Sequence, residues 1–515
     1  MYPIRKYVQG GIASMHTHSL SSRVYKVMTV LVALALCLTP LGSSIAQPLS
    51  DPPIVVTETS SWGVGTLSDL ELRYLITQMT LPEKINLVHG NPDSTCSTAY
   101  VSPSVQGCLG QAGHITGVVR LGIPPLRLTD GPAGIRLSHE ATAMPAPVGL
   151  TATFDPAAAK LYGVVMGREG RALNQDVLLA PMMNQVSVPT AGRNFETTGE
   201  DPYLASQLIG PLVEGIQDQG LIATLKHYVA NDFENGRNST SVKIDDRTLY
   251  EMELQPFEAG VKAGAGSVMC AYNRINDVYA CSNDKTQNQI LRNEFGFTGW
   301  IMSDWGATHR TSDLIYGLDM AMPSGSTGNG WADSVLTSAV LSGTAAVSLT
   351  NDFPAVPAYS SAQWQAALDE AVFRILKQMN NAGLLEGTIF GSHYTDGTPY
   401  IPPRPDLAAL KPGSFAAAQL IAEQSATLLK NEGNLLPLTS SDFSGNGVLV
   451  MGPTSVAPYI GGGGSANVTP YQNVQSPYSA LKAAAGGGAN IRYIPGYDLD
   501  GILMPSTVIS APLTS

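Results

Sequence analysis

A repeating pattern of short apolar segments sets the strongest limit on how this chain can fold. Runs rich in Val, Ile, Leu and Met end abruptly in polar residues, and stretches with helical periodicity separate them. Strands that alternate with helices predict a parallel sheet. Because the pattern extends over about 320 residues, from Gly65 to Leu385, we predict an α/β protein with a closed (β/α)8 TIM-like barrel. The clearest runs are Leu126–Asp130, Val177–Pro181, Ile222–His227, Ser267–Asn273, Trp300–Asp304 and Leu318–Met322.

Helices are predicted on both sides of these runs. Leu70–Met79 carries apolar residues at helical spacing, with Ser68 or Asp69 available as its N-cap. Thr80 opens a second helix that runs to about Val88. The last long amphipathic helix of this region is expected over 366–384.

The sequence pattern of the chain changes after residue 385. The segment Gly391–Gly413 contains five prolines, which is typical of a linker between domains. Phe415–Lys430 predicts a helix, and Val448–Met451 predicts a strand that leads to the glycine-rich segment Gly461–Ser465. Only about 85 residues follow that helix, which is short for a domain with a closed core, so we expect the start of an α/β sandwich domain and a C-terminally truncated chain. The expected division is a signal peptide at 1–46, the barrel at 47–385, the linker at 386–414 and the incomplete sandwich domain at 415–515.

The N-terminal region has the pattern of an export signal. Arg23 and Lys26 precede the apolar run Val27–Leu38, and the small-residue site Ser44–Ala46 follows. A membrane anchor is the alternative, but it needs about 20 apolar residues. We therefore expect signal cleavage, a secreted or periplasmic location, and no membrane attachment afterwards.

Four cysteines remain after signal removal, and an even number in an exported chain allows disulfides. Three pairings are possible. Short loops favour Cys96–Cys108 and Cys270–Cys281, and free buried thiols are the alternative. No Cys or His cluster has zinc-site spacing, so we expect no metal.

Charge and motifs exclude several classes of function. With 29 basic and 41 acidic residues, the net charge of −12 disfavours nucleic-acid binding. Gly461–Gly464 lacks the following Lys of a phosphate-binding loop, and no G-x-S-x-G sequence is present. We expect no cofactor.

Polar residues follow the predicted strands, where barrel enzymes place their reactive groups. Each has a plainer explanation by itself: a turn, a helix cap or packing. Together, charged donors and acceptors with an indole suit a polyhydroxylated ligand such as a carbohydrate. The set comprises Asp130, Arg193, Lys226, His227, Tyr272, Asp304 and Trp305.

At these residues the chain resembles the family 3 glycoside hydrolases of the β-glucosidase type. The resemblance covers about 65–480 and rests on eight motifs in the family's order. They are Leu75–Lys84, Arg127–Arg136, Gly192–Tyr203, Lys226–Asp232, Asp246–Leu249, Val268–Asn273, Gly296–Trp305 and Leu428–Leu438.

The resemblance implies a two-step retaining hydrolysis with two carboxyl groups. Asp304 matches the nucleophile, and positive charge from Lys226 or Arg193 is expected to lower its pKa. The residues that match the family's sugar-binding positions are Asp130, Arg193, Lys226 and His227, and Arg136 is expected to support them. Met269 and Tyr272 match residues that line the reaction centre. Trp305 is expected to form a wall of the sugar subsites. Cys270 and Cys281 match a small disulfide loop of secreted relatives.

One departure concerns the acid/base. The resemblance implies a Glu downstream of the glycine-rich segment, yet no Glu follows Ser465. The remaining candidate acids are Asp498 and Asp500, and neither stands in a sequence motif of the family. We therefore expect the acid/base beyond Ser515. Relatives that use a barrel-borne acid carry a Lys-His-x-x-Gly-His loop, whereas His227 is followed here by Tyr-Val-Ala-Asn.

The sequence therefore predicts a retaining exo-β-glycosidase that removes terminal non-reducing glucosyl residues from oligosaccharides or aryl glucosides. Two alternatives stay open. One is a β-xylosidase or broader exo-glycosidase of the same family, and the other is a sugar-binding module without turnover. The sequence leaves the oligomeric state open.

Overall fold

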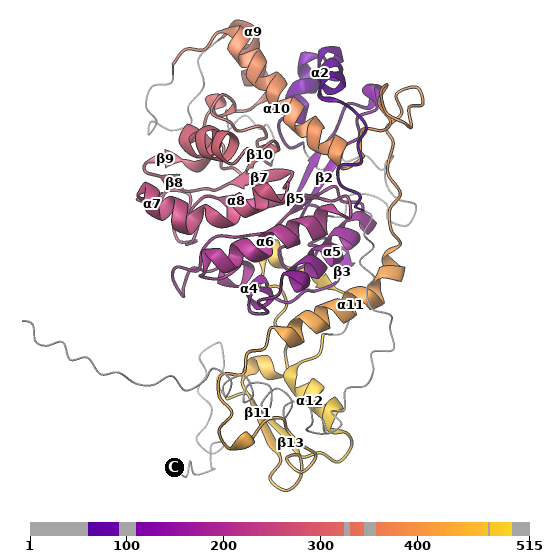
Figure 1. Cartoon of the computed structure of the whole chain (residues 1–515), viewed down its shortest axis with the longest axis vertical. Coiled ribbons are helices and arrows are strands. Elements are labelled where there is room, and N and C mark those ends of the chain that lie inside the picture. The colour runs from indigo at the N-terminus through magenta and orange to yellow at the C-terminus, as the bar shows by residue number, and fades with distance from the viewer. Residues whose placement is uncertain (1–59, 92–109, 324–329, 344–356, 472–473, 497–515) are drawn as a thin grey trace, which may run out of the picture. The chain divides into compact units, whose positions relative to one another are not determined.

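The computed structural model describes residues 60–91, 110–323, 330–343, 357–471 and 474–496. The expected signal peptide at 1–46, the cysteines Cys96 and Cys108, and the acids Asp498 and Asp500 lie outside these ranges. Figure 1 shows the chain with its elements labelled. No helix in the described ranges is long and apolar enough to cross a membrane.

The two predicted helices before the sheet are confirmed as α2 (Asp69–Gln78) and α3 (Leu81–Leu87). Ser68 is the N-cap of α2: its side chain accepts a hydrogen bond from the Glu71 amide, and Glu71 bonds back to Ser68. The predicted helix at 366–384 is α10, which begins earlier, at Ser361, because Ser360 and Gln363 form the same reciprocal cap.

The main sheet has six strands in the order β1-β2-β4-β5-β7-β10. They are β1 (Gly113–Ile115), β2 (Leu126–Asp130), β4 (Val177–Leu179), β5 (Ile222–Tyr228), β7 (Ser267–Cys270) and β10 (Trp300–Ser303). The five strands from β2 onward pair in parallel, as predicted, but β1 pairs with β2 in antiparallel fashion. The segment 116–125 that joins these two strands is too short for the crossover that a parallel pair needs, so the pair is antiparallel. The sequence analysis did not predict β1.

Two further segments close the sheet into a ring, so the TIM-like barrel is confirmed. The segment around Met320 pairs in parallel with β10, and the segment around His89 pairs in parallel with Ala321. The ring closes where the Asn91 amide donates to the His114 carbonyl in β1, 2.7 Å away. The predicted strand at 318–322 is thus present as bridges.

Helices cover the outside of the barrel and follow the strands in turn (Figure 1). Helices α5 (Pro156–Ala172) and α6 (Pro202–Gln217) pack closely at glycines. A Cβ on Gly163 would lie 2.3 Å from the Leu212 carbonyl oxygen, and one on Gly215 would lie 2.3 Å from that of Lys160. The helices around the sheet are α4 (Pro147–Thr151), α5 (Pro156–Ala172), α6 (Pro202–Gln217), α7 (Asp246–Thr248), α8 (Gln255–Lys262), α9 (Asp333–Ser342) and α10 (Ser361–Asn381).

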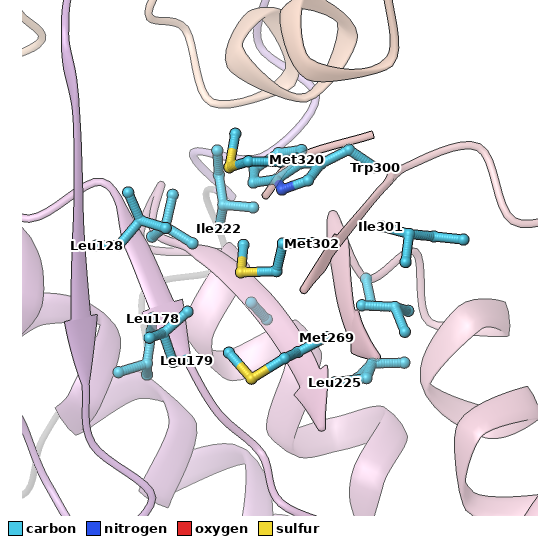
Figure 2. Packing of buried hydrophobic residues seen from close by; sticks show 14 of the residues in the cluster. Leu128, Leu178, Leu179, Ile222, Leu225, Met269, Trp300, Ile301, Met302 and Met320 are labelled. Atoms are coloured by element: carbon cyan, nitrogen blue, oxygen red, sulfur yellow. The ribbon is translucent and has the colours of Figure 1, made fainter. Parts of the chain in front are cut away.

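The barrel interior is filled by apolar side chains from successive strands. Leu128, Met269 and Met302 come from β2, β7 and β10 and are at most 2% exposed; Figure 2 shows them among their buried neighbours. Because side chains alternate along a strand, Leu128 shares a face with Asp130, and Met302 shares a face with position 304. The apolar interior therefore leads directly to the polar residues at the strand ends.

A disulfide joins Cys270, at the end of β7, to Cys281, with 5.2 Å between the Cα atoms. The small strands nearby are β6 (Ser241–Val242), β8 (Arg274–Ile275) and β9 (Val278–Tyr279), which form a separate three-stranded sheet. The π-helix η7 (Lys285–Glu294) follows.

The helix predicted over 415–430 is α11, which spans Leu407–Gln424 and therefore begins inside the predicted linker. The Asp406 side chain caps it by accepting from the Ala408 amide, and Pro412 lies within the helix, so the proline did not mark its start. Beyond it, β11 (Val448–Met451) and β13 (Ile491–Ile494) pair in parallel, with α12 (Pro477–Ala485) between them in sequence.

Candidate active site

All nine residues that the sequence placed at the site line one cavity of about 670 Å³. They are Asp130, Arg136, Arg193, Lys226, His227, Met269, Tyr272, Asp304 and Trp305. The cavity lies at the carboxyl ends of the parallel strands, because Asp130 ends β2 and Asp304 follows β10 directly. Gly192, Phe195, Glu196, Arg237, Gln111, Ala112 and the loop 462–465 complete the lining.

Strand β5 contributes two consecutive residues, Lys226 and His227, to this cavity. Successive side chains of a regular strand point to opposite faces. The pairing of β5 with β7 shifts register between Leu225 and Tyr228, and such an irregularity redirects side chains at the end of a strand. The local break in the ladder therefore allows both residues to face the site.

Asp304 is 7% exposed and lies among donors and cations. The Trp305 amide donates to its Oδ1 at 2.7 Å, and its Oδ2 lies 3.5 Å from His227 Nε2. Burial raises the pKa of Asp304 above its usual value, although the Trp305 amide, the Tyr272 hydroxyl and the charge of Lys226 act to lower it. The expected lowering effect of the Lys226 charge is present, but burial outweighs it, so the net shift of this pKa is upward.

His227 is held in one orientation and one tautomer by Asn184. The Asn184 side chain accepts from the His227 backbone amide at 2.9 Å and donates to the His227 carbonyl at 2.9 Å, which fixes the amide orientation. The same Asn184 oxygen lies 3.2 Å from His227 Nδ1, so Nδ1 carries the proton. Burial, with the charges of Arg193 and Lys226, lowers the pKa of His227 well below 6.5. Its Nε2 is therefore a hydrogen-bond acceptor, 3.3 Å from the Arg193 guanidinium.

Arg193 is clamped by a carboxylate that the sequence analysis did not single out. Glu196, 2% exposed, accepts two hydrogen bonds from Arg193, at 2.7 and 3.1 Å. Such a two-point contact fixes the plane of the guanidinium. Glu196 stands in the Gly192–Tyr203 motif, so the signal for it was present in the sequence.

Asp130 faces two cations. Lys226 Nζ lies 3.6 Å from one carboxylate oxygen, and the Arg136 guanidinium lies 3.8 Å from the other. Lys226 is 2% exposed, and burial lowers its pKa while Asp130 opposes that effect. The three side chains form a fixed array of donors and acceptors suited to neighbouring hydroxyl groups.

Arg237 and Glu234 are further residues that the sequence analysis missed. They lie in the loop after β5, where they pair with each other, and Arg237 packs 4.3 Å from the centre of the Tyr272 ring. Glu234 also lies 3.9 Å from Arg193. The loop has no periodicity, and the only available signal was its cluster of polar residues directly after a strand.

The glycine-rich segment closes one side of the cavity. The Ser465 hydroxyl lies 2.9 Å from Arg193 and 3.2 Å from Glu196. Gly462 packs on Phe195 so closely that a Cβ would lie 2.4 Å from the ring, which explains the requirement for glycine there. The short strands β12 (Thr469–Pro470) and β3 (Glu140–Ala141) pair in parallel and hold this segment in place.

Among the residues described, no group of three or more Cys, His, Asp or Glu side chains is arranged to hold a metal ion.

Comparison with known proteins places this geometry in context. The family model described as glycosyl hydrolase family 3 N terminal domain matches residues 111–324. A probable beta-glucosidase F of Aspergillus fumigatus is 34% identical over 418 residues, 78% of this chain and 46% of the relative. The thermostable beta-glucosidase B of Acetivibrio thermocellus is 33% identical over 449 residues, 84% of this chain and 51% of the relative.

Among solved structures, the beta-glucosidase DesR from Streptomyces venezuelae, in complex with D-glucose, is 39% identical with a TM-score of 0.70. The match covers 86% of this chain and 52% of that one. The chain thus spans about half the length of the relatives it matches.

Proposed function

The chain belongs to glycoside hydrolase family 3, and on that premise we propose that it is a retaining exo-β-glycosidase. It removes terminal non-reducing β-D-glucosyl residues from oligosaccharides or aryl glucosides. The observation that carries this proposal is a buried carboxylate, Asp304, at the edge of a cavity lined by fixed hydroxyl-binding groups. The relatives named above, called β-glucosidases, support glucose as the sugar.

In the proposed first step, an Asp304 oxygen attacks the anomeric carbon of the sugar. The bond to the leaving group breaks, the leaving oxygen departs with the electron pair, and a glycosyl ester forms on Asp304. Oδ1 accepts the Trp305 amide, which orients the carboxylate and leaves Oδ2 toward His227 and the cavity. Water then hydrolyses the ester and releases the sugar with its original anomeric configuration.

The sugar is held by groups whose own partners prevent them from moving. Asp130 and Lys226 offer an acceptor and a donor to adjacent hydroxyls, and neutral His227 lies beside them with its Nε2 accepting from Arg193. Arg193 keeps its plane through Glu196. Trp305, whose indole N–H donates to the Ala112 carbonyl at 3.1 Å, presents a fixed ring to the apolar face of a sugar.

The second carboxyl group of the mechanism is not evident among the described lining residues. The cavity contains the carboxylates Asp130, Glu196 and Asp304, and the first two already face cations. We propose that the acid/base lies outside the described residues. The same observation favours one alternative, a sugar-binding module without turnover.

We also propose export to a secreted or periplasmic location, where oligosaccharides would be met. The N-terminal sequence pattern supports this, and the Cys270–Cys281 disulfide suits an oxidising compartment.

A substrate with a very good leaving group tests the proposed activity, since it needs no general acid. We expect the protein to release dinitrophenol from dinitrophenyl β-D-glucoside and to give β-glucose as the first sugar product by NMR. The Asp304→Asn variant should be at least about 1000-fold slower. Faster release from the β-xyloside would select the xylosidase alternative, and binding of glucose without any release would select the binding module.

A further inference from the structure

Asn184 is a buried side chain that makes three contacts with a single residue of the active site. It is 1% exposed and lies in the segment after β4, beside His227 of β5. Its Nδ2 donates to the His227 carbonyl and its Oδ1 accepts from the His227 backbone amide, both at 2.9 Å. A flipped amide would place a donor against that backbone N–H and an oxygen against that carbonyl. The backbone of His227 therefore determines which way the Asn184 amide points.

The protonation of the His227 ring follows from contacts at its two nitrogens. Asn184 Oδ1 lies 3.2 Å from Nδ1, and because this oxygen can only accept, Nδ1 carries a proton. The Arg193 guanidinium lies 3.3 Å from Nε2, and because a guanidinium can only donate, Nε2 has no proton. The geometry thus requires a neutral ring with its proton on Nδ1, and the lowered pKa of His227 agrees with it.

The backbone on both sides of Asn184 is bonded to neighbouring segments. Before it, the Met183 amide donates to the Lys226 carbonyl in β5 at 2.9 Å. After it, the Gln185 amide donates to Asp232 Oδ1 at 3.0 Å. The Asn184 side chain is therefore held in place without help from a bound sugar.

The position of the His227 proton matters because the same Nε2 faces the proposed nucleophile. Nε2 lies 3.5 Å from Asp304 Oδ2, the oxygen that the proposed mechanism leaves toward the cavity. A proton on Nε2 would be donated to Oδ2, and such a hydrogen bond stabilises the carboxylate anion and makes it less reactive. It would also end the contact in which Nε2 accepts from Arg193. With the proton on Nδ1, Oδ2 keeps its lone pairs for the anomeric carbon.

We propose that Asn184 is a positioning residue for the first step of the reaction: by holding the His227 proton on Nδ1, it keeps a competing donor away from Asp304 Oδ2. This proposal rests on the function proposed above, because it assigns Asn184 a role in the same reaction. Asn184 does not line the catalytic cavity, so it acts on the reaction through His227.

The first test needs no reaction, so it separates failure of this proposal from failure of the proposed function. NMR of the free protein with ¹⁵N-labelled histidines distinguishes a protonated ring nitrogen from an unprotonated one, and the spectrum of His227→Gln assigns the signals. At pH 7 we expect His227 to carry its proton on Nδ1 and none on Nε2. A proton on Nε2 in the wild type would overturn the proposal even if the glycosyl-enzyme forms.

The same spectrum of Asn184→Leu tests the cause. This change nearly keeps the size of the side chain and removes all three contacts with His227. The proton on Nδ1 then has no partner, so a population with the proton on Nε2, donated to Asp304, should appear. A His227 signal identical to that of the wild type would show that Asn184 does not set the proton position.

The second test is the rate of glycosyl-enzyme formation with a 2-fluoro-glucosyl reagent. Asn184→Leu should lower it about tenfold, as for a buried donor left without its acceptor. The matched control is Asn380→Leu in α10: Asn380 is 6% exposed and makes the same pair of backbone contacts, to Leu67, at 2.9 and 3.3 Å. It should lose stability to urea but keep both the wild-type rate and the wild-type His227 signal.

A wild-type rate in Asn184→Leu, or an equal loss of rate in the two variants, would overturn the proposal. Failure of the wild type itself to react would instead count against the proposed function, and the His227 spectra would still decide whether Asn184 sets the proton position.

Discussion

The barrel and the segment after residue 407 show the same alternation of strands and helices in sequence but differ in burial. All seven residues of β5 are buried, as are all four of β7 and of β10. In β11 the residues alternate between partly buried and exposed, and α12 has no buried residue. Apolar periodicity therefore predicts the element, whereas burial depends on what packs against it.

The two regions also make different contributions to the candidate active site. The barrel supplies Asp304, the proposed nucleophile, and the paired charges around it. The later segment supplies glycine backbone and one hydroxyl, Ser465. We therefore expect large effects from substitutions in the barrel and small effects from those in the later segment.

The largest of these effects is expected for Lys226→Met, which removes a buried cation and leaves the partly buried Asp130 without its closest partner. Removing one member of a buried charge pair costs about 2–5 kcal/mol, so the second-order rate constant for an activated glucoside should fall at least about 30-fold. Lys160→Met, which removes partly exposed pairs of α5 to Glu214 and Asp218, is the matched control and should keep the wild-type rate. A loss below threefold for Lys226→Met would show that the barrel charges do not hold the sugar.

Stability offers a direct comparison of the two regions. Leu225→Ala in fully buried β5 should lower the free energy of unfolding by about 2–5 kcal/mol. Leu449→Ala in β11, where the side chain is 48% exposed, should cost less than about 1 kcal/mol. Urea unfolding of the two variants measures both values. Similar losses would mean that β11 is packed as tightly as the barrel.

The acid limb of the pH profile tests the burial of Asp304. Its pKa is raised by burial, so on acidification Asp304 loses its charge earlier than an exposed Asp, whose pKa is near 3.8. The rate of glycosyl-enzyme formation should fall about tenfold per pH unit below that raised pKa. His227 adds no inflection near 6.5, because its pKa lies well below that value. An acid limb centred below 3.8 would contradict the burial argument.

The smallest effect is expected for Ser465→Ala. It removes hydrogen bonds to Arg193 and Glu196, which hold each other through two stronger contacts. The rate constant should fall about three- to tenfold, as for loss of one hydrogen bond. Ser444→Ala, in an exposed turn, is the control. A loss as large as that for Lys226→Met would show that the later segment is as essential to the site as the barrel.

Much of this account could be predicted from sequence, because periodicity and strand ends are local signals. Those signals predicted the parallel strands and seven of the nine site residues, and the family resemblance added Arg136 and Met269. They could not identify Asn184, whose role is a contact across two strands to His227, nor Arg237, which lies in a loop without periodicity. The antiparallel pairing of β1 and the net upward shift of the Asp304 pKa could not be predicted from sequence either, because both depend on tertiary packing.

The central claim, that Asp304 is a nucleophile presented by the barrel, is tested most directly by trapping. The protein is incubated with a 2-fluoro-glucoside that has a very good leaving group, and its intact mass and peptides are then measured. We predict a single added fluoro-glucosyl group, located on Asp304. A folded protein that acquires no adduct from the gluco or xylo reagent, or that carries it on another residue, would contradict the account.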